Sequence, residues 1–132
     1  MTRILAVLAC LFGAGAAAAE PVIYQCAIAE SNAGGGYLSP QVIISHDAAT
    51  GEAIVYDAIV HHVHGKPIPA KIVQADAKRL TVSWRVTLRN GTGQVTQMSY
   101  RAVYLKGLKS FMLSARPSGF EDIFEGRGTC KL

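Results

Sequence analysis

Several features that identify enzymes and membrane proteins are missing from this chain of 132 residues. The sequence contains no G-x-S-x-G nucleophile motif, no phosphate-binding glycine loop and no H-E-x-x-H metal motif. Beyond residue 19, no apolar run approaches the roughly 20 residues of a membrane-spanning helix, and no apolar period of about 3.6 residues persists for three helical turns. We therefore expect a small soluble domain without enzymatic activity, cofactor or transmembrane segment.

The N-terminal segment has the order of features of a secretory signal peptide. One positive charge precedes an apolar run over residues 4–12, and Ala17-Ala18-Ala19 supplies an A-x-A cleavage site. Val7-Leu8-Ala9-Cys10 loosely resembles a lipoprotein cleavage box, but its leucine fits that box poorly and cleavage there would leave too short an apolar region. We expect residues 1–19 to be removed, residues 20–132 to form one domain, and the protein to be periplasmic or secreted.

Only two of the three cysteines remain after that cleavage, Cys26 and Cys130. An even pair in an exported chain predicts a disulfide bond. This bond would join the first and last parts of the domain. Gly126 and Gly128 share a strand face with Cys130, where larger side chains would crowd the crosslink or the neighbouring strand.

The most regular pattern lies in residues 80–89, where apolar and polar side chains alternate without exception. Such alternation predicts a strand with one buried face and one solvated face. Asn90-Gly91 follows, and this dipeptide is a strong hairpin signal. The loop must have an odd length, because only that register places the apolar residues of the next strand, about 94–105, on the Trp84 face.

The next turn is predicted from the same pairing argument. A two-residue loop at Lys106-Gly107 would place Ala102 opposite Phe111 and Tyr100 opposite Leu113. Apolar side chains then continue on one face across all three strands. We expect the aromatic residues on this face to form a packed interior.

The remaining segments bring the count to about eight strands joined mostly by short loops, so sequential neighbours should be antiparallel. A meander of this length tends to curl and close, which hides its edges. We predict an all-β fold, in which a single antiparallel meander closes into a small barrel or curled sandwich with its ends joined by the disulfide. The expected strands are residues 22–29, 41–46, 53–63, 68–74, 80–89, 94–105, the segment between 107 and 117, and 123–131.

His61, His62 and His64 form the only dense cluster of possible metal ligands. In the expected strand, His62 and His64 point to one face and His61 to the other, and two imidazoles are too few for a stable site. His46 lies at the far end of the same hairpin, about 25 Å away at about 3.3 Å per residue. We therefore predict no metal site, and keep metal or small-ligand carriage, by these histidines or by the barrel interior, as an alternative function.

The net charge of +4 is unevenly distributed, because residues 20–65 contain no lysine or arginine. Arg85, Arg89 and Arg101 fall on the face opposite Trp84, on two adjacent strands. This patch could bind a carboxylate, a phosphate or an acidic partner surface, and an ordinary solvated sheet face is the other interpretation. Nucleic acid is not expected, because no aromatic side chains interleave with these arginines.

Three short segments resemble a known family. They are Tyr24-Gln25-Cys26, the late Cys130 and Tyr104-Leu105-Lys106-Gly107. They are similar to the small periplasmic barrels that inhibit C-type lysozymes, which have Y-x-C near the start, a W-x-K-G-like hairpin and a closing cysteine. Tyr104 stands where that family has tryptophan, and residues 117–127 add a turn and most of a strand. The resemblance implies a barrel and inhibition of a secreted hydrolase, and no inhibitory residue is assigned from it.

These observations together predict an exported domain with a binding or envelope-accessory role. Its partner would be another envelope or secreted protein, or a small ligand. Inhibition of a secreted hydrolase such as lysozyme and carriage of a metal or small ligand are the alternatives.

Overall fold

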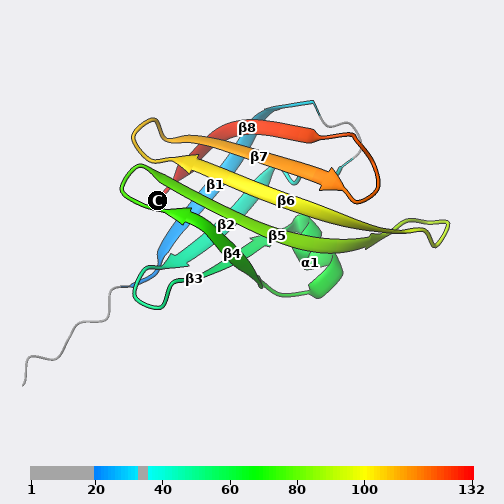
Figure 1. The fold of residues 1–132 in the computed structure, drawn as a ribbon, viewed down its shortest axis with the longest axis horizontal. Helices are drawn as coiled ribbons and strands as arrows, with labels where there is room; N and C mark the ends of the chain where they lie inside the picture. Colours follow the sequence, from blue (N-terminus) through cyan, green and yellow to red (C-terminus); the bar gives the residue numbers. More distant parts are fainter. Residues whose placement is uncertain (1–19, 33–35) are drawn as a thin grey trace, which may run out of the picture.

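The computed structural model describes residues 20–32 and 36–132. The predicted signal peptide, including Cys10, lies outside the described residues. Eight antiparallel strands close into a barrel in chain order, which confirms the predicted fold (Figure 1). The elements are β1 (Val22–Ser31), β2 (Gln41–Asp47), β3 (Glu52–Asp57), α1 (Ala58–His64), β4 (Ile68–Ala75), β5 (Arg79–Arg89), β6 (Val95–Leu105), β7 (Ser110–Pro117) and β8 (Phe124–Lys131).

The hairpin of β5 and β6 has the predicted odd loop length and the predicted buried face. Trp84 lies opposite Tyr100, and Arg89 opposite Val95, so that residues 90–94 form a loop of odd length. The side chain of Asn90 accepts hydrogen bonds from the backbone amides of Thr92 and Gln94 at 3.1 and 2.9 Å. This asparagine therefore organises the loop that the Asn-Gly signal predicted.

The turn between β6 and β7 differs from its prediction. Leu105 pairs with Ser110, so the loop has four residues instead of two, and Tyr104 faces Phe111. The predicted pairs were wrong by two positions, whereas the predicted buried face is correct, because a shift of two residues leaves every side chain on its own face. In the predicted register, Tyr104 would have faced Lys109 at the buried end of the hairpin. The observed register replaces that lysine with an aromatic partner.

The predicted strand over residues 53–63 was also wrong in its second half. β3 ends at Asp57, and α1 begins directly after it. The Asp57 Oδ1 accepts a hydrogen bond from the Val60 amide at 2.7 Å, and Gly65 ends the helix with a φ of 69°. An aspartate N-cap and a left-handed glycine at the other end favour a helix, and here they outweigh the strand preference of the β-branched residues between them.

The barrel closes where β8 pairs with β1. Cys26 lies directly opposite Cys130, and the two form the predicted disulfide with Cα atoms 4.0 Å apart. A Cβ atom added at Gly128 would lie 1.7 Å from the carbonyl oxygen of Ala27, and one at Gly126 would lie 2.8 Å from the Ile28 side chain. Gly128 is therefore required for the close approach of these strands, whereas a side chain at Gly126 would force Ile28 to shift, and both agree with the expected crowding.

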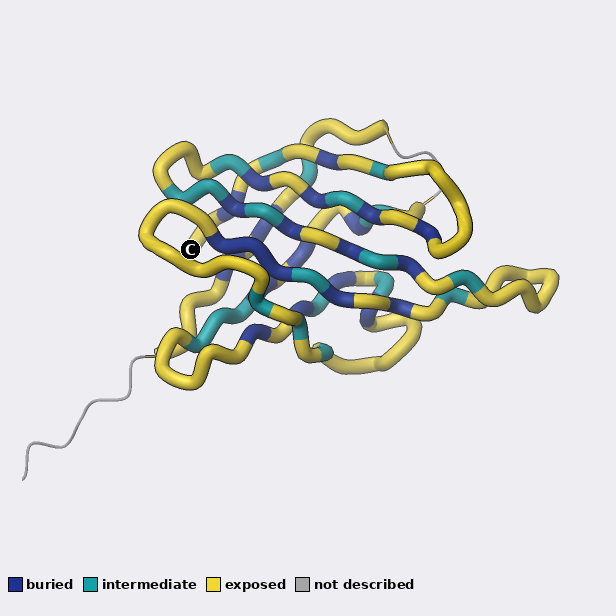
Figure 2. Tube along the Cα trace, in the orientation of Figure 1, coloured by how far each residue is buried: buried dark blue, intermediate teal, exposed yellow. Residues whose placement is uncertain are grey.

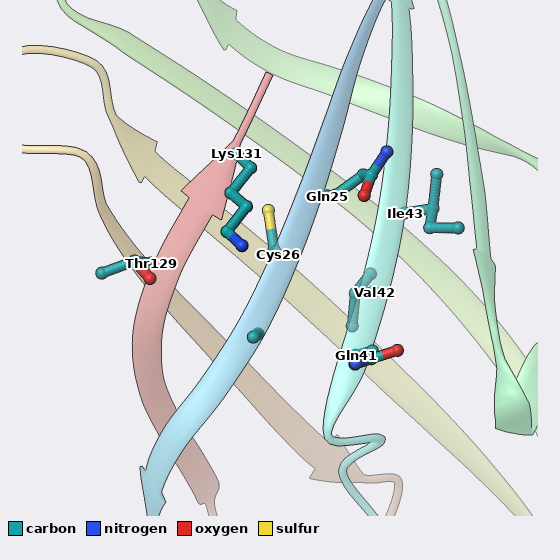
Figure 3. A pocket seen from close by; sticks show the side chains of 8 residues that line it. Gln25, Cys26, Gln41, Val42, Ile43, Thr129 and Lys131 are labelled. Carbon is teal, nitrogen blue, oxygen red and sulfur yellow. The ribbon is translucent and has the colours of Figure 1, made fainter.

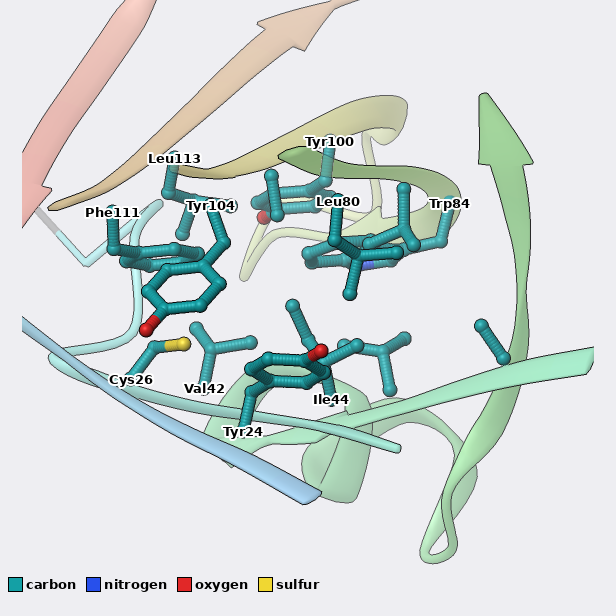
Figure 4. Close-up of a cluster of buried hydrophobic side chains, with 14 of the residues drawn as sticks. Tyr24, Cys26, Val42, Ile44, Leu80, Trp84, Tyr100, Tyr104, Phe111 and Leu113 are labelled. Atoms are coloured by element: carbon teal, nitrogen blue, oxygen red, sulfur yellow. The ribbon is translucent and has the colours of Figure 1, made fainter. Parts of the chain in front are cut away.

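Side chains fill the barrel interior (Figure 4). Buried and exposed residues alternate along the strands, as Figure 2 shows most clearly for β6 and β7. The Trp84 ring stacks on Tyr100 with ring centroids 5.5 Å apart, and Tyr24 packs against Tyr104 at 5.2 Å. The inward aromatic residues thus form a packed interior, as predicted. No helix among the described residues is long and apolar enough to cross a membrane.

Candidate functional site

Three arginines gather on the outer surface of β5, β6 and β7. Ser99 on β6 pairs with Arg85 on β5 and with Arg116 on β7, and Arg101 lies two residues further along β6 on the same face. Adjacent strands are about 4.8 Å apart, so the backbones of Arg85 and Arg116 are separated by about 10 Å. All three side chains are exposed. We call Arg85, Arg101 and Arg116 the arginine face.

The structure brings together only part of the predicted basic patch. Arg85 and Arg101 are diagonal neighbours across β5 and β6, as expected. Arg89 lies four residues beyond Arg85, about 13 Å along the strand, and it lines a pocket at the end of the barrel. Sequence reasoning missed Arg116. Its outward position was available from the alternation in β7, but the predicted register would have placed it opposite Gln97 instead of Ser99.

The arginine face carries an excess of positive charge. Among the residues that the structure describes, none of its guanidinium groups makes an ion pair or a hydrogen bond. The neighbouring carboxylate is Glu125 on β8, which pairs with Ser114 and is therefore a diagonal neighbour of Arg116, at about 7–8 Å, and two strands from Arg101. Like charges that are close on one sheet face repel one another. Folding alone therefore gains nothing from placing these three arginines together. A negatively charged partner would relieve their repulsion.

The residues around these arginines leave the guanidinium groups prominent. Ser83 and Ser114 flank Arg101, and Ser99 separates Arg85 from Arg116. Short hydroxyl side chains allow the longer arginines to project above the sheet. None of the best-formed pockets of the described surface is lined by an arginine of this face. The site is therefore an open, cationic sheet surface.

The histidine cluster lies on α1 instead of on a strand, so its predicted arrangement was wrong. The ring of His61 makes a hydrogen bond with the Tyr56 hydroxyl through Nδ1, and the two rings meet edge to face. His46 lies opposite Ala53 at the far end of its hairpin, as predicted. Among the described residues, no group of three or more histidine, cysteine or acidic side chains could hold a metal ion. A helix C-terminus is a favourable position for histidine because of the helix dipole.

Asp57 is a buried carboxylate that the sequence reasoning did not single out. Its side chain caps α1 through Oδ1, while its Oδ2 makes no hydrogen bond with a described residue. Burial raises the pKa of Asp57, and the hydrogen bond from the Val60 amide opposes that rise. The Tyr100 hydroxyl, whose pKa is raised by burial and by the charge of Asp57, donates a hydrogen bond to the Tyr37 carbonyl at 2.9 Å.

A small pocket lies beside the disulfide, on the outer surface of β8, β1 and β2 (Figure 3). Gln25, Ile43, Thr129 and Lys131 contribute to its lining, and its volume is about 190 Å³. Ligand pockets usually exceed about 300 Å³. We therefore assign no ligand to this pocket.

Comparison with protein-family models, with curated proteins and with solved structures found no match for this chain. The functional argument accordingly comes from the geometry and chemistry of the described residues.

Proposed function

We propose that this protein is an exported binding domain that engages an acidic surface of another protein through its arginine face. The observation that carries the proposal is the cluster of three exposed, unpaired arginines around Ser99. Export is supported by the signal-peptide pattern of residues 1–19, and the disulfide agrees with an oxidising compartment.

The openness of this face favours a macromolecular partner over a small anion. An exposed ion pair in water contributes at most about 1 kcal/mol. A small carboxylate or phosphate on a surface without a pocket would remain hydrated and weakly held. A large partner that covers the face excludes water, and charge-assisted hydrogen bonds to arginine are then much stronger.

The surrounding side chains favour a protein partner over a nucleic acid or a membrane. The outward neighbours of these arginines on β5 and β6 are serine, threonine, glutamine and Val103, so they include no aromatic ring on which a base could stack. Val103 and the exposed Met112 flank it, but two such side chains do not form the broad apolar face that enters a bilayer. A guanidinium group binds a carboxylate through two parallel hydrogen bonds. Clustered aspartate and glutamate side chains on a partner fit this chemistry.

A charge-reversal experiment tests this proposal. The full chain, expressed with its N-terminal segment so that export is retained, is compared with Arg85→Glu/Arg101→Glu/Arg116→Glu. The matched control is Lys66→Glu/Lys78→Glu/Lys109→Glu, which changes the net charge equally in loops away from this face. A partner isolated from the producing cell envelope is then purified and titrated against all three proteins.

We expect the arginine variant to bind that partner at least about 100-fold more weakly, because several close charge pairs are lost and reversed. The affinity of the lysine variant should be within a few-fold of that of the unmodified protein. Added salt should weaken the binding of these two proteins. Equal losses of affinity in the two variants would show that the net charge of the protein, and not the arginine face, determines binding. Undiminished binding by the arginine variant would refute the proposal, and so would a captured partner that lacks an acidic surface.

Inhibition of a secreted hydrolase remains a prediction, since no contact described here points to an enzyme active site. Carriage of a metal or small ligand, by His61, His62 and His64 or by the barrel interior, remains an untested alternative. The helix placement of these histidines adds no argument in its favour.

A further inference from the structure

The end of the barrel near α1 carries a pocket of about 460 Å³. This volume falls within the range of about 300 to 1,000 Å³ that is usual for small-molecule sites. Three separate connections meet here: the segment before β2 contributes Tyr37, the β5–β6 loop contributes Arg89 and Gln94, and the β7–β8 loop contributes Phe120 and Asp122. Figure 1 shows the two loops extending to the same side of the barrel.

Exposed aromatic rings form one part of the pocket lining. Tyr37 stacks in parallel on Phe124, with ring centroids 4.8 Å apart and an interplanar angle of 14°. Tyr37 is nevertheless 41% exposed, and Phe120 is 53% exposed. Large aromatic side chains normally bury most of their surface. Here they present flat apolar surfaces to the solvent inside a concave site.

The aromatic positions are fixed by contacts with the barrel. The hydroxyl of the buried Tyr100 donates a hydrogen bond to the Tyr37 carbonyl at 2.9 Å. The Ser118 amide donates to the Gln97 carbonyl of β6 at 2.9 Å, and Gly119 has a φ of 83° in the turn that presents Phe120. These bonds tie two of the three connections to strand β6. The pocket is therefore largely formed before any ligand arrives.

The polar lining combines both charges with uncharged hydrogen-bonding groups. Arg89 and Asp122 contribute one positive and one negative charge, so the lining carries no net charge. Gln94 and Thr96 add amide and hydroxyl groups. The Oε1 of Gln94 accepts a bond from Asn90 at 3.3 Å, which leaves its amide hydrogens available as donors. Donors and acceptors thus surround an apolar aromatic surface.

We propose that this pocket binds a neutral saccharide. The axial C–H face of a pyranose ring is apolar and fits flat against Phe120 or Tyr37. The ring hydroxyl groups can donate to the Asp122 carboxylate and accept from Arg89 and the Gln94 amide. A lining without net charge gives no preference for an anion or a cation, and a purely apolar ligand would leave the polar groups of the lining without partners. The site is distinct from the arginine face and does not depend on it.

The test is a titration of the full chain, followed residue by residue with amide NMR spectra. The probes are chitotriose, cellotriose and maltotriose, each added to millimolar concentration. We expect saturable shifts with at least one of them, confined to residues 36–40, 88–96 and 117–124. Phe120→Ala should weaken binding by about threefold to tenfold, which corresponds to the loss of one aromatic contact. Asp122→Asn should weaken it by a similar factor through the lost acceptor charge.

Both substituted side chains are exposed, so these variants should fold. Leu108→Ala is the matched control, because Leu108 is 76% exposed in the loop at the opposite end of the barrel, and it should bind as the unmodified chain does. The charge-reversed arginine-face variant should also bind as the unmodified chain does, which separates this inference from the proposed function. The absence of shifts with all three probes would overturn the proposal. Shifts outside the pocket, or unchanged affinity in both Phe120→Ala and Asp122→Asn, would also overturn it.

Discussion

Ser45 on β2 and Ser99 on β6 occupy equivalent positions on the outer surface, four strands apart in the closed barrel. Ser99 lies between Arg85 and Arg116, with Arg101 two residues along the strand. Ser45 is surrounded in the same way by isoleucines, the exposed side chains of Ile23, Ile43 and Ile54. We call these three residues the isoleucine face.

The two faces differ in how far local structure accounts for them. Isoleucine is a strong strand former, and apolar atoms contribute more than half of the surface of a folded protein. Strand formation therefore suffices to explain the isoleucine face. Three unpaired arginines gain no comparable benefit from the strand and repel one another. Strand formation thus leaves the arginine face, on β5 to β7, without a local explanation.

The strongest test of the barrel itself lies where these two halves meet. Gly128→Ala should prevent folding or lower the free energy of unfolding by at least about 4 kcal/mol, because the added Cβ atom would overlap the Ala27 carbonyl. Gly107→Ala is the control, since its Cβ atom would meet nothing within 4 Å, and it should change stability by less than about 0.5 kcal/mol. Urea unfolding measures both. Equal changes in stability for the two variants would show that β8 and β1 do not approach each other as closely as the structure shows.

The disulfide is the covalent link between the two halves. Cys26→Ser combined with Cys130→Ser should lower the free energy of unfolding by about 2–5 kcal/mol, because the unfolded chain loses its crosslink between residues far apart in sequence. The measurement is denaturant unfolding under non-reducing conditions. Two free thiols titrated in the oxidised, folded protein would contradict the closure of the barrel described here.

Asp57 is the last residue of β3, in the half of the barrel that carries the isoleucine face, and its side chain caps α1. Substitutions of Asp57 therefore test that half. Asp57→Ala should cost about 1 kcal/mol, the usual contribution of an N-cap. Asp57→Asn retains an oxygen acceptor and cannot ionise. Since burial raises the folded-state pKa of this carboxyl above 3.8, its contribution to stability is greatest below that value and is lost as pH rises through the folded-state pKa.

The stability of Asp57→Asn relative to the unmodified protein should therefore increase from acidic to neutral pH. Urea unfolding over that pH range provides the measurement. A relative stability that does not change with pH would show that Asp57 titrates alike in the folded and unfolded chain.

The smallest expected effect comes from a direct comparison of the two faces. Arg85→Gln/Arg101→Gln/Arg116→Gln should raise the free energy of unfolding by a few tenths of a kcal/mol at low salt, because repulsion within the face is relieved, and high salt should abolish this gain. Ile23→Thr/Ile43→Thr/Ile54→Thr should show no such salt dependence. A salt-independent change in the arginine variant would remove the electrostatic contrast between the faces.

The period of two in strands explains what the sequence could predict. It places Trp84, Tyr100 and Phe111 inside the barrel and the arginines outside, whatever the length of each turn. It cannot distinguish registers that differ by two residues, and for this reason the β6–β7 pairs were misassigned.

The helix and the pocket were missed for different reasons. Residues 58–64 contain β-branched side chains that favour a strand, and only the flanking Asp57 and Gly65 signalled a short helix. The pocket depends on Tyr37, Gln94 and Phe120, which come from three distant connections. Local patterns carry no information about how such loops meet above a barrel.

The Cys26–Cys130 bond has a further consequence for a protein exposed to proteases. The two cysteines are separated by 104 positions, so every loop of the barrel lies within the covalent ring that they close. A single cleavage in any of these loops leaves the two fragments joined. The strands on either side of the cut remain paired with their other neighbours, and the nicked domain can keep its fold. Release of a fragment requires either a second cleavage or reduction of the disulfide.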